Sequence, residues 1–292
     1  MKGIGITTNC RAGESFVEVL RNIKEAGFDS VMVDENCAME LEQGITLAQE
    51  QDLRVPYVHL QSWKANDLWT EGEQNRLFVK DMINRIEICA RHSVPVAVLH
   101  PANTSRPNDP VPEPSGAGLE SMHEILRHAE KHNVRIALEN IDSSKLKNLF
   151  YLLDNVDSPY LGFCYDCGHN MLFTPEIDLM GKYGNRCIAI HIHDNNMSEC
   201  IDGWHNDEHL IPGDGKIDFD RVARQIAKSP YNGDLMLESV QSPNCPKMNY
   251  LNMTSKEFLK KAHERGTLLT EKTHRFRNID GGGPDNPILS VK

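Results

Sequence analysis

The chain has 292 residues, of which 39% are hydrophobic and 25% are charged. This length and composition suit one large α/β domain or two average domains, and they exclude a disordered or fibrous protein. The 42 acidic residues outnumber the 31 lysines and arginines, the net charge is −11, and no basic run stands out, which argues against a nucleic-acid partner.

The start of the chain, MKGIGITTNC, has no apolar core of a signal peptide, and no stretch approaches the roughly 18 apolar residues of a membrane helix. We therefore expect a cytoplasmic protein without a membrane partner. The eight cysteines lack the spacing of a disulfide framework, as expected of reduced thiols.

Short apolar runs alternate with amphipathic stretches along most of the chain, a pattern typical of buried parallel strands alternating with helices. The expected strands cover residues 3–7, 30–34, 55–60, 94–100, 134–139, 161–166, 187–193 and 234–239. The expected helices cover residues 14–26, 40–51, 71–92, 116–132, 145–155, 176–183, 219–228 and 254–265. This order predicts an α/β protein with a single (β/α)8 TIM barrel. The alternative is a doubly wound open sheet, but no G-x-G-x-x-G follows the first strand.

We expect one barrel domain over residues 1–266 and a C-terminal extension over residues 267–292. The strand–helix pattern fades after Arg265 into Asp280-Gly-Gly-Gly-Pro-Asp, which is typical of a loose tail. Such a tail is free to cover the barrel or a partner subunit, so a homo-oligomer stays open.

Metal-competent side chains end most of the expected strands from the third onward. The carboxyl ends of the strands form the active-site mouth of a TIM barrel, so these side chains are expected to converge there. Glu139, Asp166, His191 and Glu238 end strands five to eight, and such a set suits Mn²⁺, Mg²⁺, Co²⁺ or Zn²⁺. We therefore predict a divalent metal held by these four. The candidates for additional ligands are His59, His100, His169, Asp207 and His209.

Two histidines near this set have several open roles. His169 follows Asp166 by three residues and is a candidate to bind a second metal, to bind substrate or to orient Asp166. His193 has the same inward parity as His191, because side chains alternate along a strand, so spacing does not decide which of the two is the ligand.

The long polar segment 194–216 is expected to be a functional loop at the barrel mouth. Asp207 and His209 within it either bind metal or tie the loop down. The backbone N–H groups of the turn Gly213-Asp214-Gly215 are candidates to hold an anion such as a substrate phosphate. Asp218 after this turn is the expected N-cap of the next helix.

Other residues of the expected mouth are candidates to hold the substrate. His59 and His100 end the third and fourth strands and either bind metal or grip substrate oxygens. Trp63 is a candidate wall against the apolar face of a sugar ring. Lys64 and Lys216 are candidates for phosphate or carboxylate binding.

The ordered segments VPYVHLQSWKANDLW, VAVLHPA, ALENI, FCYDCGHN, AIHIHDN, DEHLIPGDGKIDF and LMLES resemble the xylose isomerase-like TIM-barrel superfamily. This superfamily contains sugar and sugar-phosphate isomerases and epimerases, hydroxypyruvate isomerase, inosose dehydratase and endonuclease IV. The resemblance runs from about the third strand to the eighth. It implies metal ligands at Glu139, Asp166, His191 and Glu238 and a substrate-binding histidine at His169.

The resemblance implies a metal-dependent isomerase or epimerase that acts on a small sugar or sugar phosphate. The proton would pass through an enediolate between the metal-bound glutamates Glu139 and Glu238. His169, and His193 beside it, would hold substrate oxygens, so the expected catalytic residues are Glu139, Glu238 and His169.

Two alternatives stay open at this stage. One is a three-zinc phosphodiesterase that cleaves abasic DNA, because the ligand pattern of endonuclease IV maps onto His59, His100, Glu139, Asp166, His169, His191, Asp207, His209 and Glu238. The other is a non-catalytic barrel that binds a sugar or a metal. The acidic composition favours the sugar enzyme over the DNA enzyme.

Overall fold

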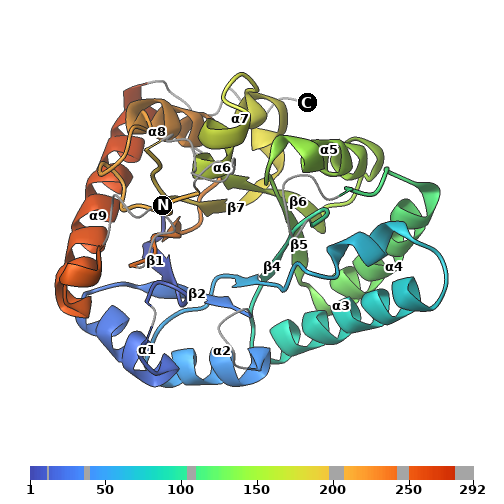
Figure 1. The fold of residues 1–292 in the computed structure, drawn as a ribbon, viewed down its shortest axis with the longest axis horizontal. Coiled ribbons are helices and arrows are strands. Elements are labelled where there is room, and N and C mark those ends of the chain that lie inside the picture. The colour runs from blue at the N-terminus through green and yellow to red at the C-terminus, as the bar shows by residue number, and fades with distance from the viewer. Residues whose placement is uncertain (12, 36–39, 104–109, 197–206, 242–249, 280–292) are drawn as a thin grey trace.

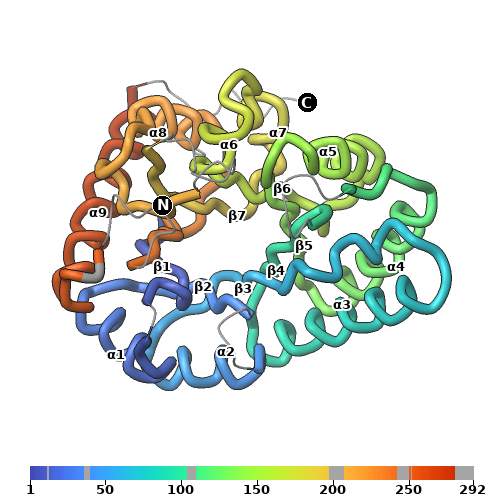
Figure 2. Tube along the Cα trace, in the orientation of Figure 1, coloured from blue at the N-terminus to red at the C-terminus, as the bar shows by residue number. Residues whose placement is uncertain are grey.

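The structure is a computed structural model that describes residues 1–11, 13–35, 40–103, 110–196, 207–241 and 250–279. Eight parallel strands form one sheet in the order β7-β6-β5-β4-β3-β2-β1-β8. A parallel bridge between Ile192 and Leu237 joins its two edges, so the sheet closes. The helices surround the strands as an outer ring (Figure 1), and the tube view shows the same arrangement of the described segments (Figure 2). The predicted TIM barrel is confirmed.

Each strand lies within a predicted range, and most helices lie within a residue or two of theirs. The strands are β1 (Ile4–Thr7), β2 (Ser30–Asp34), β3 (Val58–His59), β4 (Val96–Leu99), β5 (Arg135–Glu139), β6 (Leu161–Asp166), β7 (Cys187–His191) and β8 (Leu235–Leu237). The helices are α1 (Phe16–Glu25), α2 (Leu41–Glu50), α3 (Glu73–Arg91), α4 (Gly116–His132), α5 (Leu146–Asn155), α6 (Cys167–Phe173), α7 (Leu179–Tyr183), α8 (Phe219–Lys228) and α9 (Ser255–Ile279). Short 3₁₀ helices are η1 (Ala65–Trp69), η2 (Ser143–Lys145), η3 (Gly184–Arg186) and η4 (Tyr250–Asn252).

The strands are buried on both faces, as parallel strands between a barrel core and a helix layer must be. In β4, Val96 and Val98 point into the barrel, whereas Ala97 and Leu99 pack in the larger core with the helices. The barrel interior is filled by Met32, Tyr57, Val96, Val98, Ala137, Cys164, Ala189 and Met236. The barrel is therefore a packed core whose chemistry must lie at its ends.

Helix α6 was not among the helices expected from the sequence. Asp166 ends β6 and caps this helix, since its carboxylate accepts a hydrogen bond from the His169 N–H at 2.7 Å. The cap starts a helix immediately at the strand end and fixes His169 beside the barrel mouth.

The prediction that a loose tail begins at residue 267 was wrong for residues 267–279. Helix α9 continues to Ile279 and contacts α8, α1, β1 and β8. Its buried face repeats every three or four residues through Ala262, Gly266, Leu269, Thr273 and Phe276, and the small and polar members of this row obscured the pattern in the sequence. Residues 280–292 lie outside the part described. Within the described helices, none is long and apolar enough to cross a membrane.

Replacing Phe276 with alanine should lower the free energy of unfolding by about 3 kcal/mol, because the change removes a buried aromatic ring near the C-terminal end of α9. The ring is 7% exposed, and the Arg224 guanidinium lies 3.8 Å from its centroid. Denaturant unfolding measures the change. Leu268→Ala is the control, because Leu268 is 55% exposed on the same helix and should tolerate the change. Equal, small effects in both variants would contradict the packing of this part of α9.

Candidate metal centre

Four of the predicted ligands meet at the carboxyl ends of neighbouring strands. Glu139, Asp166 and His191 are the last residues of β5, β6 and β7, and Glu238 directly follows β8. The Nδ1 atom of His191 lies 3.1 Å from Glu139 Oε1, 3.5 Å from Glu238 Oε2 and 3.8 Å from Asp166 Oδ2. We call these residues the inner group. Ligands bound at about 2.0–2.2 Å lie roughly 3–3.5 Å from one another, so the inner group fits one divalent ion.

The second oxygen of Glu139 belongs to another set of donors, which we call the histidine pair. Glu139 Oε2 lies 3.1 Å from His59 Nε2 and 3.2 Å from His100 Nε2, and these two nitrogens are 3.1 Å apart. Two imidazole nitrogens in contact cannot both be unprotonated acceptors unless a cation lies between them. The spacing and chemistry of the histidine pair with Glu139 thus also fit a metal ion.

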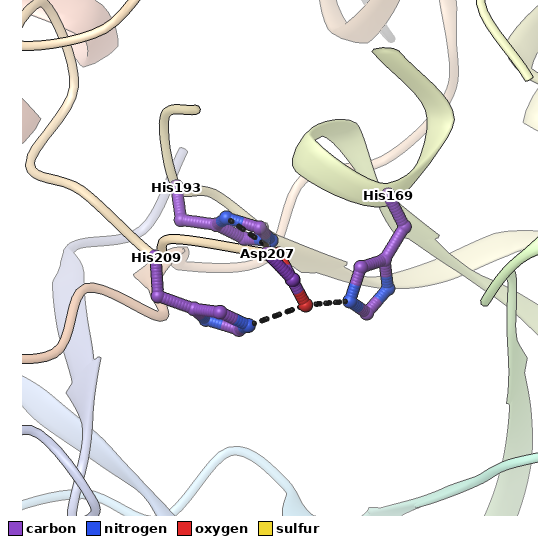
Figure 3. A group of neighbouring side chains, drawn as sticks. All are labelled: His169, His193, Asp207 and His209. Atoms are coloured by element: carbon purple, nitrogen blue, oxygen red, sulfur yellow. Dashed lines mark hydrogen bonds and ion pairs between the residues drawn. The ribbon is translucent and has the colours of Figure 1, made fainter. Parts of the chain in front are cut away.

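A third set, the loop group, contains His169, His193, Asp207 and His209 (Figure 3). Asp207 Oδ2 lies 2.9 Å from both His169 Nε2 and His209 Nε2 (Figure 3). His193 Nδ1 is 3.8 Å from the other oxygen of Asp207. The structure therefore brings the four predicted ligands and the five additional candidates into three adjoining donor sets.

Backbone carbonyls orient the histidines of the loop group. The Nδ1 atom of His169 lies 3.0 Å from the carbonyl oxygen of Asn140, and that of His209 lies 2.7 Å from the carbonyl oxygen of Glu238. A carbonyl only accepts, so each Nδ1 carries a hydrogen, and each Nε2 faces the Asp207 carboxylate, where it can bind a metal ion once it loses its own proton. Metal-binding histidines are commonly held in this way.

His193, a predicted substrate ligand, is fully buried behind Asp166. Its Nε2 atom lies 3.1 Å from Asp166 Oδ1, and its ring stacks on His209 with centroids 3.9 Å apart. Gly168 makes room for the ring, because a Cβ atom there would lie 2.0 Å from His193 Cε1. The position of His193 suits a residue that orients Asp166 and His209.

The pKa values of the two glutamates of the inner group are shifted in opposite directions. Burial alone would raise the pKa of Glu139, but the nearby imidazoles of His191, His100 and His169 outweigh it and hold that pKa well below the usual range. Burial raises the pKa of Glu238, and the carboxylates of Glu139 and Asp166 add to this effect. Glu238 Oε2 has no hydrogen-bond partner among the residues described. Glu238 is therefore the carboxyl group better suited to accept and release a proton.

Protons compete with metal ions for these histidines. Burial opposes protonation of His59 and His209, but contact with Glu139 and Asp207 respectively raises the pKa of each to about 10. Because an imidazole must lose its proton to bind metal, metal affinity at these positions is expected to rise with pH.

Three predicted substrate ligands belong to none of the three donor sets. Trp63 is 60% exposed, and with Lys64 and Arg85 it lines a separate cavity of about 230 Å³, whose lining includes none of the nine donors. The chain turns into η1 after Lys64, and Trp69 is the tryptophan that is buried there. The side chain of Lys216 is exposed to solvent. Their substrate roles stay predictions.

The turn Gly213-Asp214-Gly215, a candidate anion site in the sequence, binds a carboxylate of the chain itself, that of Asp194. Asp194 Oδ2 accepts hydrogen bonds from the N–H groups of Gly213 at 2.8 Å and Gly215 at 2.9 Å. The other oxygen of Asp194 accepts from Ile217 N–H at 3.0 Å. These bonds tie down the loop that carries His209. Asp218 is the N-cap of α8, as predicted.

Asp194 and Asn140 hold parts of the candidate site in place through hydrogen bonds, and neither was among the residues expected from the sequence. The side chain of Asn140 accepts a hydrogen bond from Asp166 N–H at 2.9 Å and donates one to Asp166 O at 2.8 Å, so it fixes the end of β6 at the candidate metal centre. Both residues directly follow predicted site residues, Glu139 and His193, and that adjacency was the available signal.

The family described as xylose isomerase-like TIM barrel matches residues 20–262. The chain belongs to this family. The resemblance inferred from the sequence motifs is thus confirmed.

Similar proteins include y4fM of Sinorhizobium fredii, which is 27% identical over 269 residues, or 88% of this chain and 79% of y4fM. An inosose dehydratase of Bacillus thuringiensis is 27% identical over 121 residues, covering 37% of this chain and 40% of that enzyme. Among solved structures, a D-tagatose 3-epimerase-like protein aligns with a TM-score of 0.68 and 21% identity over 96% of this chain and 99% of that one. The IolI protein with a binding zinc atom aligns with a TM-score of 0.71 and 16% identity over 93% and 99%. The two structures show a shared fold.

Proposed function

We propose that this protein is a divalent-metal-dependent isomerase or epimerase that moves a proton on a small sugar or sugar phosphate. The observation that carries the proposal is Glu238, a buried carboxyl group of the inner group with a raised pKa and one oxygen that has no hydrogen-bond partner among the residues described. The family, the inosose dehydratase relatives and the epimerase-like structures support a sugar substrate.

A metal ion bound by the inner group would polarise a carbonyl and a neighbouring hydroxyl of the sugar. Glu238 removes the proton next to the carbonyl, and a pKa raised above that of an ordinary glutamate makes its carboxylate a stronger base. Glu139 shares both oxygens with imidazoles and therefore acts first as a ligand. His169, which α6 carries beside the inner group, is the residue we propose to hold a substrate oxygen through its Nε2 atom.

The number of bases distinguishes the two reaction types. If Glu238 is the only base, it returns the proton to the same face of the substrate. Return to the neighbouring carbon then gives an isomer in which the carbonyl has shifted by one carbon. Epimerisation requires a second group on the opposite face, and Glu139 is then the candidate.

The test is proton exchange from deuterium oxide into a panel of ketoses, aldoses and their phosphates, followed by NMR. The metal-loaded protein should exchange the proton next to the carbonyl of at least one sugar, and a chelator should stop the exchange. Full metal occupancy without exchange of any sugar would contradict the proposal and favour the non-catalytic barrel.

A second candidate, a three-metal phosphodiesterase that cleaves abasic DNA, is favoured by the completeness of the three donor sets. Elemental analysis separates it from a one-metal enzyme by the number of ions bound at the barrel mouth. Three ions there together with nicking of abasic-site DNA would establish it. The net charge of −11 argues against DNA as the substrate.

A further inference from the structure

A second cluster of metal-competent side chains lies outside the barrel mouth, between α3 and α4. These two helices pack against each other (Figure 1). Glu87 is in the last turns of α3, and His128 and His132 are in the last turns of α4. A spacing of four residues puts both histidines on one face of the helix.

The geometry of this cluster fits one ion. One ligand atom from each residue lies within 4.8 Å of the others, and His132 Nε2 is 3.9 Å from Glu87 Oε1. His128 Nδ1 and His132 Nε2 are shielded from solvent, yet neither has a hydrogen-bond partner among the residues described. Shielded polar atoms without a partner are costly, and a bound cation would satisfy them.

The chemistry of the cluster favours Zn²⁺ or a related transition metal. Two imidazoles and one carboxylate form a common zinc donor set, with water as the fourth ligand. The carbonyls at the C-terminal end of α4 also place negative partial charge beside His132, which favours a cation there.

We propose that Glu87, His128 and His132 form a peripheral zinc site that clamps α3 to α4. The side chain of Glu87 is 43% exposed, that of His132 is 25% exposed, and His128 is partly exposed. An ion therefore reaches the site from solution. The site shares no residue with the inner group, the histidine pair or the loop group. It therefore stands or falls independently of the function proposed for the barrel mouth.

The experiment compares zinc bound by the full chain and by the double variant His128→Ala/His132→Ala after equilibration and desalting. The wild-type protein should hold one more zinc ion per chain than the variant, whatever number the barrel mouth holds. Zinc should also raise the melting temperature of the wild-type protein more than that of the variant, because an ion that binds only the folded state stabilises it.

Two further variants make the result decisive. His123→Ala removes an exposed histidine of α4 that is outside the cluster, and it should keep the wild-type zinc count. Glu87→Gln keeps the side-chain shape and should weaken the peripheral site about tenfold or more. Sugar proton exchange should be unchanged in all variants. An equal zinc count in the wild-type protein, the double variant and Glu87→Gln overturns the proposal.

Discussion

Replacing Glu139 with glutamine should strip the barrel mouth of tightly bound metal and abolish metal-dependent turnover. One oxygen of Glu139 serves the inner group and the other serves the histidine pair, so one substitution weakens both. The amide also turns an N–H group toward imidazole nitrogens that are ligand candidates. We expect metal affinity to fall by more than the roughly 10–100-fold that follows from loss of a supporting hydrogen bond.

Metal titration and elemental analysis measure this effect. The matched control is Glu113→Gln, because the side chain of Glu113 is 81% exposed and pairs only with a surface lysine, Lys147, among its described ion pairs. The control should keep the wild-type affinity and rate. If Glu139→Gln bound metal as tightly as the wild-type protein, Glu139 would not be the centre of the site.

Replacing Glu238 with glutamine should lower the rate of sugar proton exchange by about 10²–10⁴-fold, the usual contribution of a general base. Glu139, Asp166 and His191 still offer three ligands, so the variant should retain metal with weaker affinity. In the wild-type protein the base is active only when deprotonated. Because burial raises the pKa of Glu238, the exchange rate should rise with pH in a range above that of an ordinary glutamate.

The pH profile separates a base from a ligand. In Glu238→Gln the rising limb should disappear, whereas Glu238→Asp, which keeps a carboxyl group, should keep a rising limb at a reduced rate. A wild-type rate in Glu238→Gln would remove Glu238 from the mechanism. A rate that excess metal restores fully would assign Glu238 to metal binding alone.

Strand positions and ligand types were predictable because each depends on local sequence. A strand buried on both faces is a short apolar run, and Glu139 and Asp166 stood out as polar residues at the ends of such runs. The end of α9 was not predictable in the same way. Gly266 and Thr273 occupy its buried face, so apolar periodicity alone ended the helix too early.

The sequence by itself determined the alternation of strands and helices, the end of the barrel at which polar groups gather and the nine candidate donors. The tertiary structure decided how those donors divide into three groups and that Glu139 joins two of them. His59 and Glu139 are 80 residues apart along the chain, and the pairing of β3 and β5 on either side of β4 brings their side chains to 3.1 Å. The tertiary structure also decided that the carboxylate of Asp194 accepts the hydrogen bonds of the N–H groups of Gly213 and Gly215. Contacts of this kind depend on how segments distant in the sequence pack together, so the local pattern of apolar and polar residues does not predict them.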